Sequence, residues 1–259
     1  MGGAAISRNR RLKKTIAVTG HQRPIDGCTK NRQSAQDLLY SLNHTRASPP
    51  GSGLDLIYLD ESLIVVNKAA GLLAVPGRGA DNQDCVASRV QAEFPDALVV
   101  HRLDMATSGL LLFARGAEMQ RCLSRLFREH RVKKRYAAVV AGKVELTAGE
   151  VSLPIAADWP NRPLRKIDAE LGKPSLTRYR LLAHDADADA GRVELEPVTG
   201  RTHQLRVHMA AIGHPILGDA LYGGEARGRA GRLLLHARML SFVHPLSGEL
   251  LTLVCEPPF

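Results

Sequence analysis

Two apolar runs enclose a polar loop in the stretch Leu98-Val99-Val100-His101-Arg102-Leu103-Asp104-Met105-Ala106-Thr107-Ser108-Gly109-Leu110-Leu111-Leu112-Phe113-Ala114. Short apolar runs bounded by polar turns predict buried strands, here over 98–100 and 110–114. The loop between them carries a carboxyl, a guanidinium, an imidazole and two hydroxyl groups. Side chains on a loop held between strands are well placed for catalysis. Asp-x-x-Thr-Ser-Gly is also ordinary turn chemistry, and the spacing alone favours that plainer interpretation.

The pattern of short apolar runs continues on both sides of this loop. It predicts further strands over 56–59, 63–67, 136–140, 177–182, 193–197 and 250–254. Apolar residues at helical spacing predict helices over 84–94, 117–130 and 202–212. Because the strands outnumber the helices and the two do not strictly alternate, we predict a single mixed α+β domain.

The composition is that of a globular protein with enough length for a core. The chain has 259 residues, of which 44% are hydrophobic, and its formal net charge is +9. No apolar run approaches the ~20 residues that a membrane-spanning helix needs, so we expect no membrane partner.

Most of the positive charge lies near the N-terminus. Residues 1–53 hold nine Lys or Arg and two Asp, a net charge of +7, which leaves +2 for residues 54–259. The segment lacks sustained apolar periodicity and ends in the linker-like run Ser48-Pro49-Pro50-Gly51-Ser52-Gly53. We predict a basic, disordered N-terminal extension over 1–53 and a folded domain over 54–259.

The cysteines and histidines do not follow a metal-binding pattern. The four cysteines are far apart in sequence and form no C-x-x-C pair, which excludes the usual zinc motifs and favours a reducing, cytoplasmic compartment. His203 and His208 are five residues apart, whereas ligands on one helix face are four apart. No phosphate-binding or dinucleotide-binding glycine motif is present. We therefore predict neither a metal nor a cofactor.

Two further clusters carry polar chemistry. An arginine on the predicted helix 202–212 that faced Asp104 would keep this carboxylate ionised and oriented, although the same pair could be a plain structural ion pair. Arg121, Arg125 and Arg128 share one face of the helix 117–130, and a basic edge with one aromatic residue, Tyr136, follows it. Such an edge suits an RNA backbone and a stacked base, but most runs of charge are merely solvated.

These stretches together resemble the RluA family of pseudouridine synthases over about residues 54–258. The matching motifs, in the family's order, are Val66-Asn67-Lys68 with Gly71-Leu72-Leu73, His101-Arg102-Leu103-Asp104 with Thr107-Ser108-Gly109, Lys134-Arg135-Tyr136, Gly200-Arg201-Thr202-His203-Gln204-Leu205-Arg206-Val207-His208, Gly213-His214-Pro215-Ile216 with Gly218-Asp219, and Leu234-Leu235-His236-Ala237 with His244-Pro245. The runs 75–78, 158–163 and 172–174 are typical of the RluA branch. Ala69 departs from the family, which usually has Pro there.

The resemblance implies a mainly antiparallel β-sheet catalytic domain with flanking helices that isomerises uridine in RNA. It implies that Asp104 is the nucleophile, that Arg206 pairs with it and that Tyr136 stacks on the flipped uracil. Arg102 matches the residue that fills the gap left by the flipped nucleotide, and Leu235 supports the uracil site. Arg125 and Arg128 are predicted to contact the RNA backbone. The branch acts on 23S rRNA and tRNA anticodon stem-loops, and we expect a monomer.

Three alternatives stay open from the sequence. The same chemistry could act on a different rRNA or tRNA uridine. A catalytically retired RNA-binding protein would be expected to have lost Asp104, Tyr136 or Arg206, and all three are present. A hydrolase using Asp104 with a histidine base would need a second converging acid or base, which the sequence does not clearly show.

Overall fold

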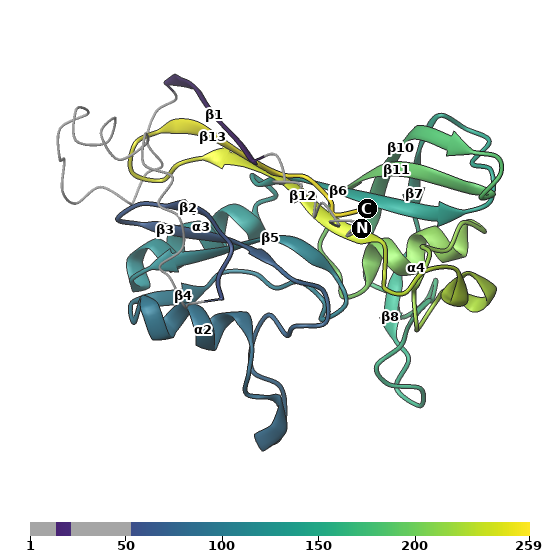
Figure 1. Ribbon diagram of the computed structural model, residues 1–259, viewed down its shortest axis with the longest axis horizontal. Coiled ribbons are helices and arrows are strands. Elements are labelled where there is room, and N and C mark those ends of the chain that lie inside the picture. The colour runs from purple at the N-terminus through teal and green to yellow at the C-terminus, as the bar shows by residue number, and fades with distance from the viewer. Residues whose placement is uncertain (1–13, 22–52) are drawn as a thin grey trace, which may run out of the picture.

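The computed structural model describes residues 14–21 and 53–259, and Figure 1 shows their arrangement. These residues form one large sheet with the strand order β2-β3-β5-β12-β6-β11-β10-β7, in which β4 pairs with β5, β13 with β12 and β1 with β13. The strands are β1 (Lys14–His21), β2 (Leu56–Leu59), β3 (Leu63–Lys68), β4 (Ala97–Val99), β5 (Ser108–Arg115), β6 (Lys133–Ala141), β7 (Ala148–Ser152), β10 (Leu176–Asp185), β11 (Ala190–Pro197), β12 (Leu235–Val243) and β13 (Glu249–Cys255). A separate pair is formed by β8 (Ile155–Ala157) and β9 (Arg165–Ile167).

The sheet is mixed and mainly antiparallel, which confirms the predicted α+β class. Among the described strands, β5 and β12 pair in parallel and the remaining pairs are antiparallel. Three α-helices accompany the sheet in the described residues, α2 (Val86–Glu93), α3 (Ala117–Arg128) and α4 (Gln204–Ala211). In Figure 1, α2 and α3 lie with β2–β5 in one half of the molecule, and α4 lies with β6, β7, β10 and β11 in the other.

The apolar run that follows the polar loop is buried on both of its faces. Leu110 and Leu112 of β5 belong to a core cluster with Leu123 and Leu126 of α3. Leu111 and Phe113 point to the other face of the strand and join a cluster with residues of α2. A strand covered on both faces must be apolar throughout, which explains why 110–114 shows no alternation.

The two halves of the sheet meet where β5 and β12 run side by side. Their register pairs Ser108 with His236 and Gly109 with Ala237. Gly109 has φ +113°, and a Cβ atom there would lie 2.4 Å from the carbonyl oxygen of Ala237. Only glycine lets the strands approach this closely, so the residue that ends the polar loop also closes the sheet.

Several strands lie outside the predicted segments. β12 crosses the middle of the sheet, and β7, β8 and β9 have three to five residues each, too few for a periodic signal. β1 lies within the predicted N-terminal extension and pairs with β13 along its length. The rest of that extension lies outside the described residues.

The cysteines differ in their state. Cys85 and Cys255 are buried free thiols, whereas Cys122 is disulfide-bonded. The sequence did not distinguish Cys122 from the other cysteines when it favoured a reducing compartment. Spacing along the chain does not report the distance between side chains in the fold.

The turn between β2 and β3 is organised by one carboxylate. Asp60 accepts hydrogen bonds from the backbone N–H groups of Ser62 and Leu63, both at 2.7 Å, and from the Tyr58 hydroxyl at 2.7 Å. His244, from the turn after β12, lies 3.1 Å from both Asp60 and the Ser62 hydroxyl through the same Nε2 atom. A catalytic Ser-His-Asp triad uses one ring nitrogen for the serine and the other for the aspartate. Here Nε2 of His244 contacts both partners, so this buried group, the Asp60 clasp, joins two turns and is not a catalytic triad.

The Asp60 clasp predicts an acid-sensitive contribution to stability. Burial alone would raise the pKa of Asp60, but its hydrogen bonds with His244, Tyr58 and Ser62 lower the pKa from 3.8 to about 2. A carboxylate with a depressed pKa in the folded state stabilises the fold above the unfolded pKa, and this stability is lost as the pH falls through the folded value. We expect Asp60→Asn to lower the free energy of unfolding by about 2 kcal/mol at neutral pH. The free energy of unfolding of the variant should also fall less steeply than that of the parent between about pH 5 and pH 2. Urea melts at several pH values measure this, and equal slopes for parent and variant would contradict it.

Candidate active site

The polar loop between β4 and β5 is fixed from below by a buried lysine. Lys68, at the end of β3, is 1% exposed and donates hydrogen bonds to the carbonyl oxygens of Ala69, Leu72 and Met105 at 2.6–2.9 Å. Gly71 N–H also donates to Met105 O, at 2.9 Å. Burial lowers the pKa of Lys68 to about 8, and the charge of Asp104 opposes that shift. The loop therefore holds Asp104 in place through the backbone of the next residue.

Arg206 of α4 holds two carboxylates at once. Its Nε and Nη2 atoms donate to the two oxygens of Asp219 at 2.8 and 2.6 Å, and its Nη1 donates to Oδ2 of Asp104 at 3.3 Å. The side chains of Arg206 and Asp219 are 5% and 1% exposed, and that of Asp104 is 21% exposed. Burial alone would lower the pKa of Arg206, but the two carboxylates raise it, so the guanidinium stays charged. The structure thus brings Arg206 to Asp104, as the resemblance implied.

Asp219 is a member of the site that sequence reasoning missed as a functional residue. It also accepts hydrogen bonds from the backbone N–H groups of Leu221 and Tyr222, at 2.9 and 3.1 Å. Burial alone would raise the pKa of Asp219, but the hydrogen bonds and charge of Arg206 lower it. Gly218-Asp219 was quoted within a motif, yet a sequence gives no sign that the carboxylate reaches α4.

His203 stands on the other side of Asp104. Its Nε2 atom lies 3.9 Å from Oδ1 of Asp104, and its Nδ1 atom lies 2.6 Å from the Tyr222 hydroxyl. It precedes α4 in the left-handed conformation, with φ +58°, which turns the chain into the helix. Burial lowers the pKa of His203, while the charge of Asp104 opposes this shift. His208, by contrast, is fully buried against Thr177 and Leu153 and lies apart from this group.

A cavity of about 570 Å³ opens above Asp104 between the two halves of the sheet. Its lining includes six of the seven predicted site residues, Arg102, Asp104, Arg128, Tyr136, Arg206 and Leu235. Leu103, Leu205 and Phe127 add apolar surface, while Lys134 and Arg201 add positive charge. Asp104 is the one carboxylate among the described residues that line it. Such a cavity, lined by both apolar and cationic side chains, suits a flat uncharged base on an anionic backbone.

Tyr136 of β6 provides the aromatic wall of the cavity. In the sheet it lies opposite Ala237 of β12 and Leu195 of β11. Burial and the charge of Asp104 raise the pKa of Tyr136, so its phenol is neutral at physiological pH.

His101 lines the cavity but is occupied by the fold. Its Nε2 atom accepts a hydrogen bond from Leu112 N–H at 3.0 Å, and its ring stacks on Phe127 with centroids 4.6 Å apart. Burial, and to a smaller extent the charge of Lys134, lower the pKa of His101 to about 3. A neutral imidazole whose Nε2 is already engaged does not supply the base that the hydrolase alternative needs.

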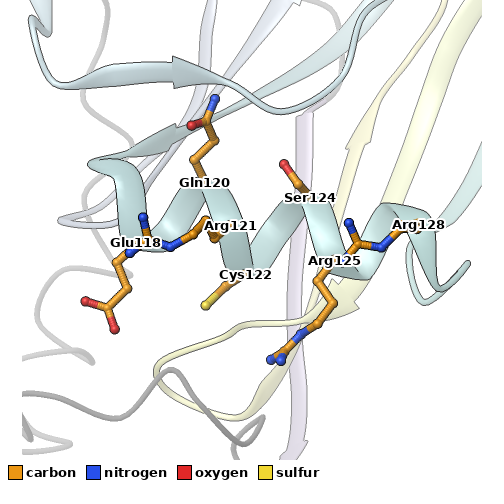
Figure 2. A pocket seen from close by; sticks show the side chains of 7 residues that line it. All are labelled: Glu118, Gln120, Arg121, Cys122, Ser124, Arg125 and Arg128. Atoms are coloured by element: carbon orange, nitrogen blue, oxygen red, sulfur yellow. The ribbon is translucent and has the colours of Figure 1, made fainter.

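The predicted arginine face of α3 is divided by the structure. Figure 2 shows Arg121, Arg125 and Arg128 with Glu118, Gln120 and Ser124 around a second cavity, of about 520 Å³. Arg128, in the last turn of the helix, lines both this cavity and the one above Asp104. Arg125 lines the outer cavity and is absent from the lining of the inner one.

Within the described residues, no group of three or more His, Cys, Asp or Glu side chains is arranged to hold a metal ion. In the same part of the chain, no helix is long and apolar enough to cross a bilayer.

Comparisons with known proteins identify the family. The family model described as RNA pseudouridylate synthase matches residues 62–211, which include the loop of Asp104, Tyr136 and Arg206. The dual-specificity RNA pseudouridine synthase RluA of Escherichia coli K12 is 49% identical over 212 residues, which cover 82% of this chain and 96% of that protein. The chain belongs to the RluA family of RNA pseudouridine synthases.

A further relative in sequence and a solved structure agree with this assignment. The protein of the same name from Yersinia pestis is 49% identical over 205 residues, covering 79% of this chain and 99% of its own. The solved structure of human RNA pseudouridylate synthase domain containing 1 superposes with a TM-score of 0.67 at 32% identity, covering 81% of this chain and 86% of the human one. The resemblance drawn from the motifs is confirmed: this chain is an RNA-modifying isomerase of the pseudouridine synthase type.

The two-carboxylate clamp on Arg206 predicts the effect of removing its inner partner. Asp219→Asn keeps the shape of the side chain but removes its charge and one of its two acceptor oxygens. The paired hydrogen bonds to Arg206 are then lost, so the direction of the guanidinium is less well fixed. Breaking hydrogen bonds to a charged group costs about 1.5–3 kcal/mol, so we expect the single-turnover rate of pseudouridine formation to fall about 10- to 150-fold.

Asp84→Asn is the matched control for this prediction, since Asp84 forms the same two-bond pair with Arg89 on the exposed surface. RNA affinity and the rate of the control should be those of the parent. A parental rate in Asp219→Asn would contradict the clamp.

Proposed function

We propose that this enzyme isomerises specific uridines of 23S rRNA and of tRNA anticodon stem-loops to pseudouridine, with Asp104 as nucleophile. The observation that carries the proposal is the Asp104 carboxylate held by a buried arginine at the floor of a partly apolar cavity. The double substrate is suggested by the name of the curated relatives, dual-specificity RNA pseudouridine synthase, which share 49% of their aligned residues with this chain.

In the proposed reaction each part of the cavity has one task. The Asp104 carboxylate attacks the extruded nucleotide, the bond between N1 of uracil and C1′ of ribose breaks, and the freed uracil turns within the cavity. A bond from C5 to C1′ then forms and the bond between the nucleotide and Asp104 breaks, which frees the carboxylate. The C5 proton leaves to solvent and N1 is protonated. The product has the atoms of the substrate, so the chemistry needs no cofactor and no metal.

The positions of the other side chains support their proposed roles. Tyr136 is a neutral aromatic wall within the cavity that can stack on the uracil, and Leu235 is a buried apolar contact beside it. Arg102 is exposed and lines the cavity next to Asp104, where it can occupy the gap left by the extruded nucleotide. Arg128 connects the cavity to the face of α3, so with Arg125 it can guide the RNA backbone.

The same proposal includes the organisation of the chain. We assign the catalytic domain to residues 54–259 and the basic extension to residues 1–53, with β1 of this extension added to β13 at the sheet edge. We expect a monomer that acts in the cytoplasm on RNA.

The proposal is tested by tritium release. Parent and Asp104→Ala are incubated with 23S rRNA and tRNA transcripts that carry tritium at C5 of uridine. Forming the bond to C5 must expel the tritium into water, so the parent should release it from both RNAs and Asp104→Ala from neither. Asp96→Ala, which removes an exposed partner of Arg115, is the control and should behave as the parent does.

Release from one RNA alone would contradict the double specificity. Tight binding of RNA by the parent without release from either would favour the retired RNA-binding protein, and release by Asp104→Ala would remove the nucleophile assignment.

A further inference from the structure

The β8–β9 hairpin stands outside the main sheet. Its strands, Ile155–Ala157 and Arg165–Ile167, pair with each other, and Ile155 makes a further bridge to Lys173. In Figure 1 the hairpin extends below α4 and away from the large sheet. The hairpin adds little to the main core, so packing of that core does not explain its sequence.

The hairpin is tied to the catalytic group by a chain of polar contacts. The Tyr222 hydroxyl accepts a hydrogen bond from Arg165 N–H at 2.9 Å and lies 2.6 Å from Nδ1 of His203. His203 in turn lies 3.9 Å from Asp104. The position of β9 is therefore set relative to the nucleophile.

A cavity of about 640 Å³ lies against the hairpin. Gly200 and Arg201 line both this cavity and the one above Asp104, so the two are neighbours across a single loop. Whatever extends out of the active site on this side meets the hairpin next. For an RNA substrate, that is a nucleotide adjacent to the target uridine.

The cavity presents an aromatic surface that the fold leaves open. Trp159 is the only tryptophan of the chain, and it is 67% exposed. The Arg162 guanidinium lies 3.7 Å from the centroid of its indole ring, a cation–π contact. An exposed indole beside an arginine is the kind of surface on which unpaired bases of RNA stack.

The charge of the cavity suits phosphate. Among the described residues that line it are four cations, Arg165, Lys166, Lys173 and Arg201, and two carboxylates, Asp158 and Asp168. Lys166 pairs with Asp168 at 3.0 Å, whereas Arg165, Lys173 and Arg201 have no carboxylate within ion-pair distance in the same part of the chain. The Nε atom of Arg165 is buried and lacks a hydrogen-bond partner in the same part of the chain. A buried donor without an acceptor is unfavourable, so this position favours an incoming anion.

We propose that the hairpin cavity is a binding subsite for an unpaired nucleotide next to the target uridine, with its base on Trp159 and its phosphates on Arg165, Lys173 and Arg201. The inference rests on the proposed RNA substrate and adds to it a place where the sequence beside the target is sensed. A peptide occupant fits less well, because the three cations and the continuity with the active site match a polyanion that already enters that site.

The test is an affinity cycle between protein and RNA variants. All proteins carry Asp104→Ala, so that the RNA stays unmodified, and the probe is a tRNA anticodon stem-loop whose loop nucleotides are replaced one at a time by an abasic nucleotide. We expect Trp159→Ala to bind the intact loop about 5- to 150-fold more weakly, the range for loss of one stacked base. Trp159→Phe should keep most of the affinity, and Leu246→Ala, an exposed apolar residue of the β12–β13 turn, should keep all of it.

The cycle should also show coupling at one position of the loop. At that position, removing the base should weaken RNA binding by the protein that keeps Trp159 by the same factor. The Trp159→Ala protein should bind the abasic loop as tightly as it binds the intact loop. Unchanged affinity in Trp159→Ala, or an equal loss on every abasic loop, would overturn the subsite. Because the cycle measures binding alone, its result is separate from that of tritium release: release without coupling overturns the subsite alone, and coupling without release overturns the proposed reaction alone.

Discussion

The structure depends on one buried guanidinium. Arg206 is held by two hydrogen bonds to Asp219 and one to Asp104, and it is the residue through which α4 contacts both the turn before Leu221 and the loop between β4 and β5. Removing a charge from water is costly unless its partners are well placed, and a buried ion pair that loses one partner leaves an uncompensated charge. Such a group tolerates few alternative arrangements. The same constraint that fixes α4 against the sheet therefore fixes the direction of the proposed nucleophile.

The position of this group follows from how the sheet is joined. The halves that carry α2 and α3 on one side and α4 on the other meet at the short parallel contact of β5 and β12, where Gly109 passes Ala237 without a side chain. The polar loop ends at that seam, so Asp104 comes from the first half and Arg206 from the second. Lys68 adds the third constraint by holding the carbonyl of Met105. A cavity at a seam between two rigid halves is open to a large substrate while its floor stays ordered.

The sequence predicted the features that show in consecutive residues. The buried run after the loop, the amphipathic helix that became α3 and the polar character of the Asp104 loop all show in consecutive residues. Asp219, His203 and Lys68 escaped as functional residues because their contacts to Arg206, Asp104 and Met105 span 13, 99 and 37 positions, and no periodicity reports such a distance. The β8–β9 hairpin escaped because its strands have three residues each, fewer than the roughly four to eight over which alternation identifies a strand. Trp159 lies in the run 158–163 that supported the resemblance, but only the fold shows that its side chain is exposed.

The central claim is that the forked geometry of Arg206, and not its charge alone, makes Asp104 reactive. Arg206→Lys tests it most directly, because lysine keeps the positive charge but cannot donate along two fixed directions to Asp219 and a third to Asp104. The measurement is the single-turnover rate of tritium release at saturating RNA, together with RNA affinity and the thermal melt of the variant. The account predicts a rate at least about 100-fold below that of the parent with little change in affinity. A variant that melts as the parent does and releases tritium at the parental rate would contradict it.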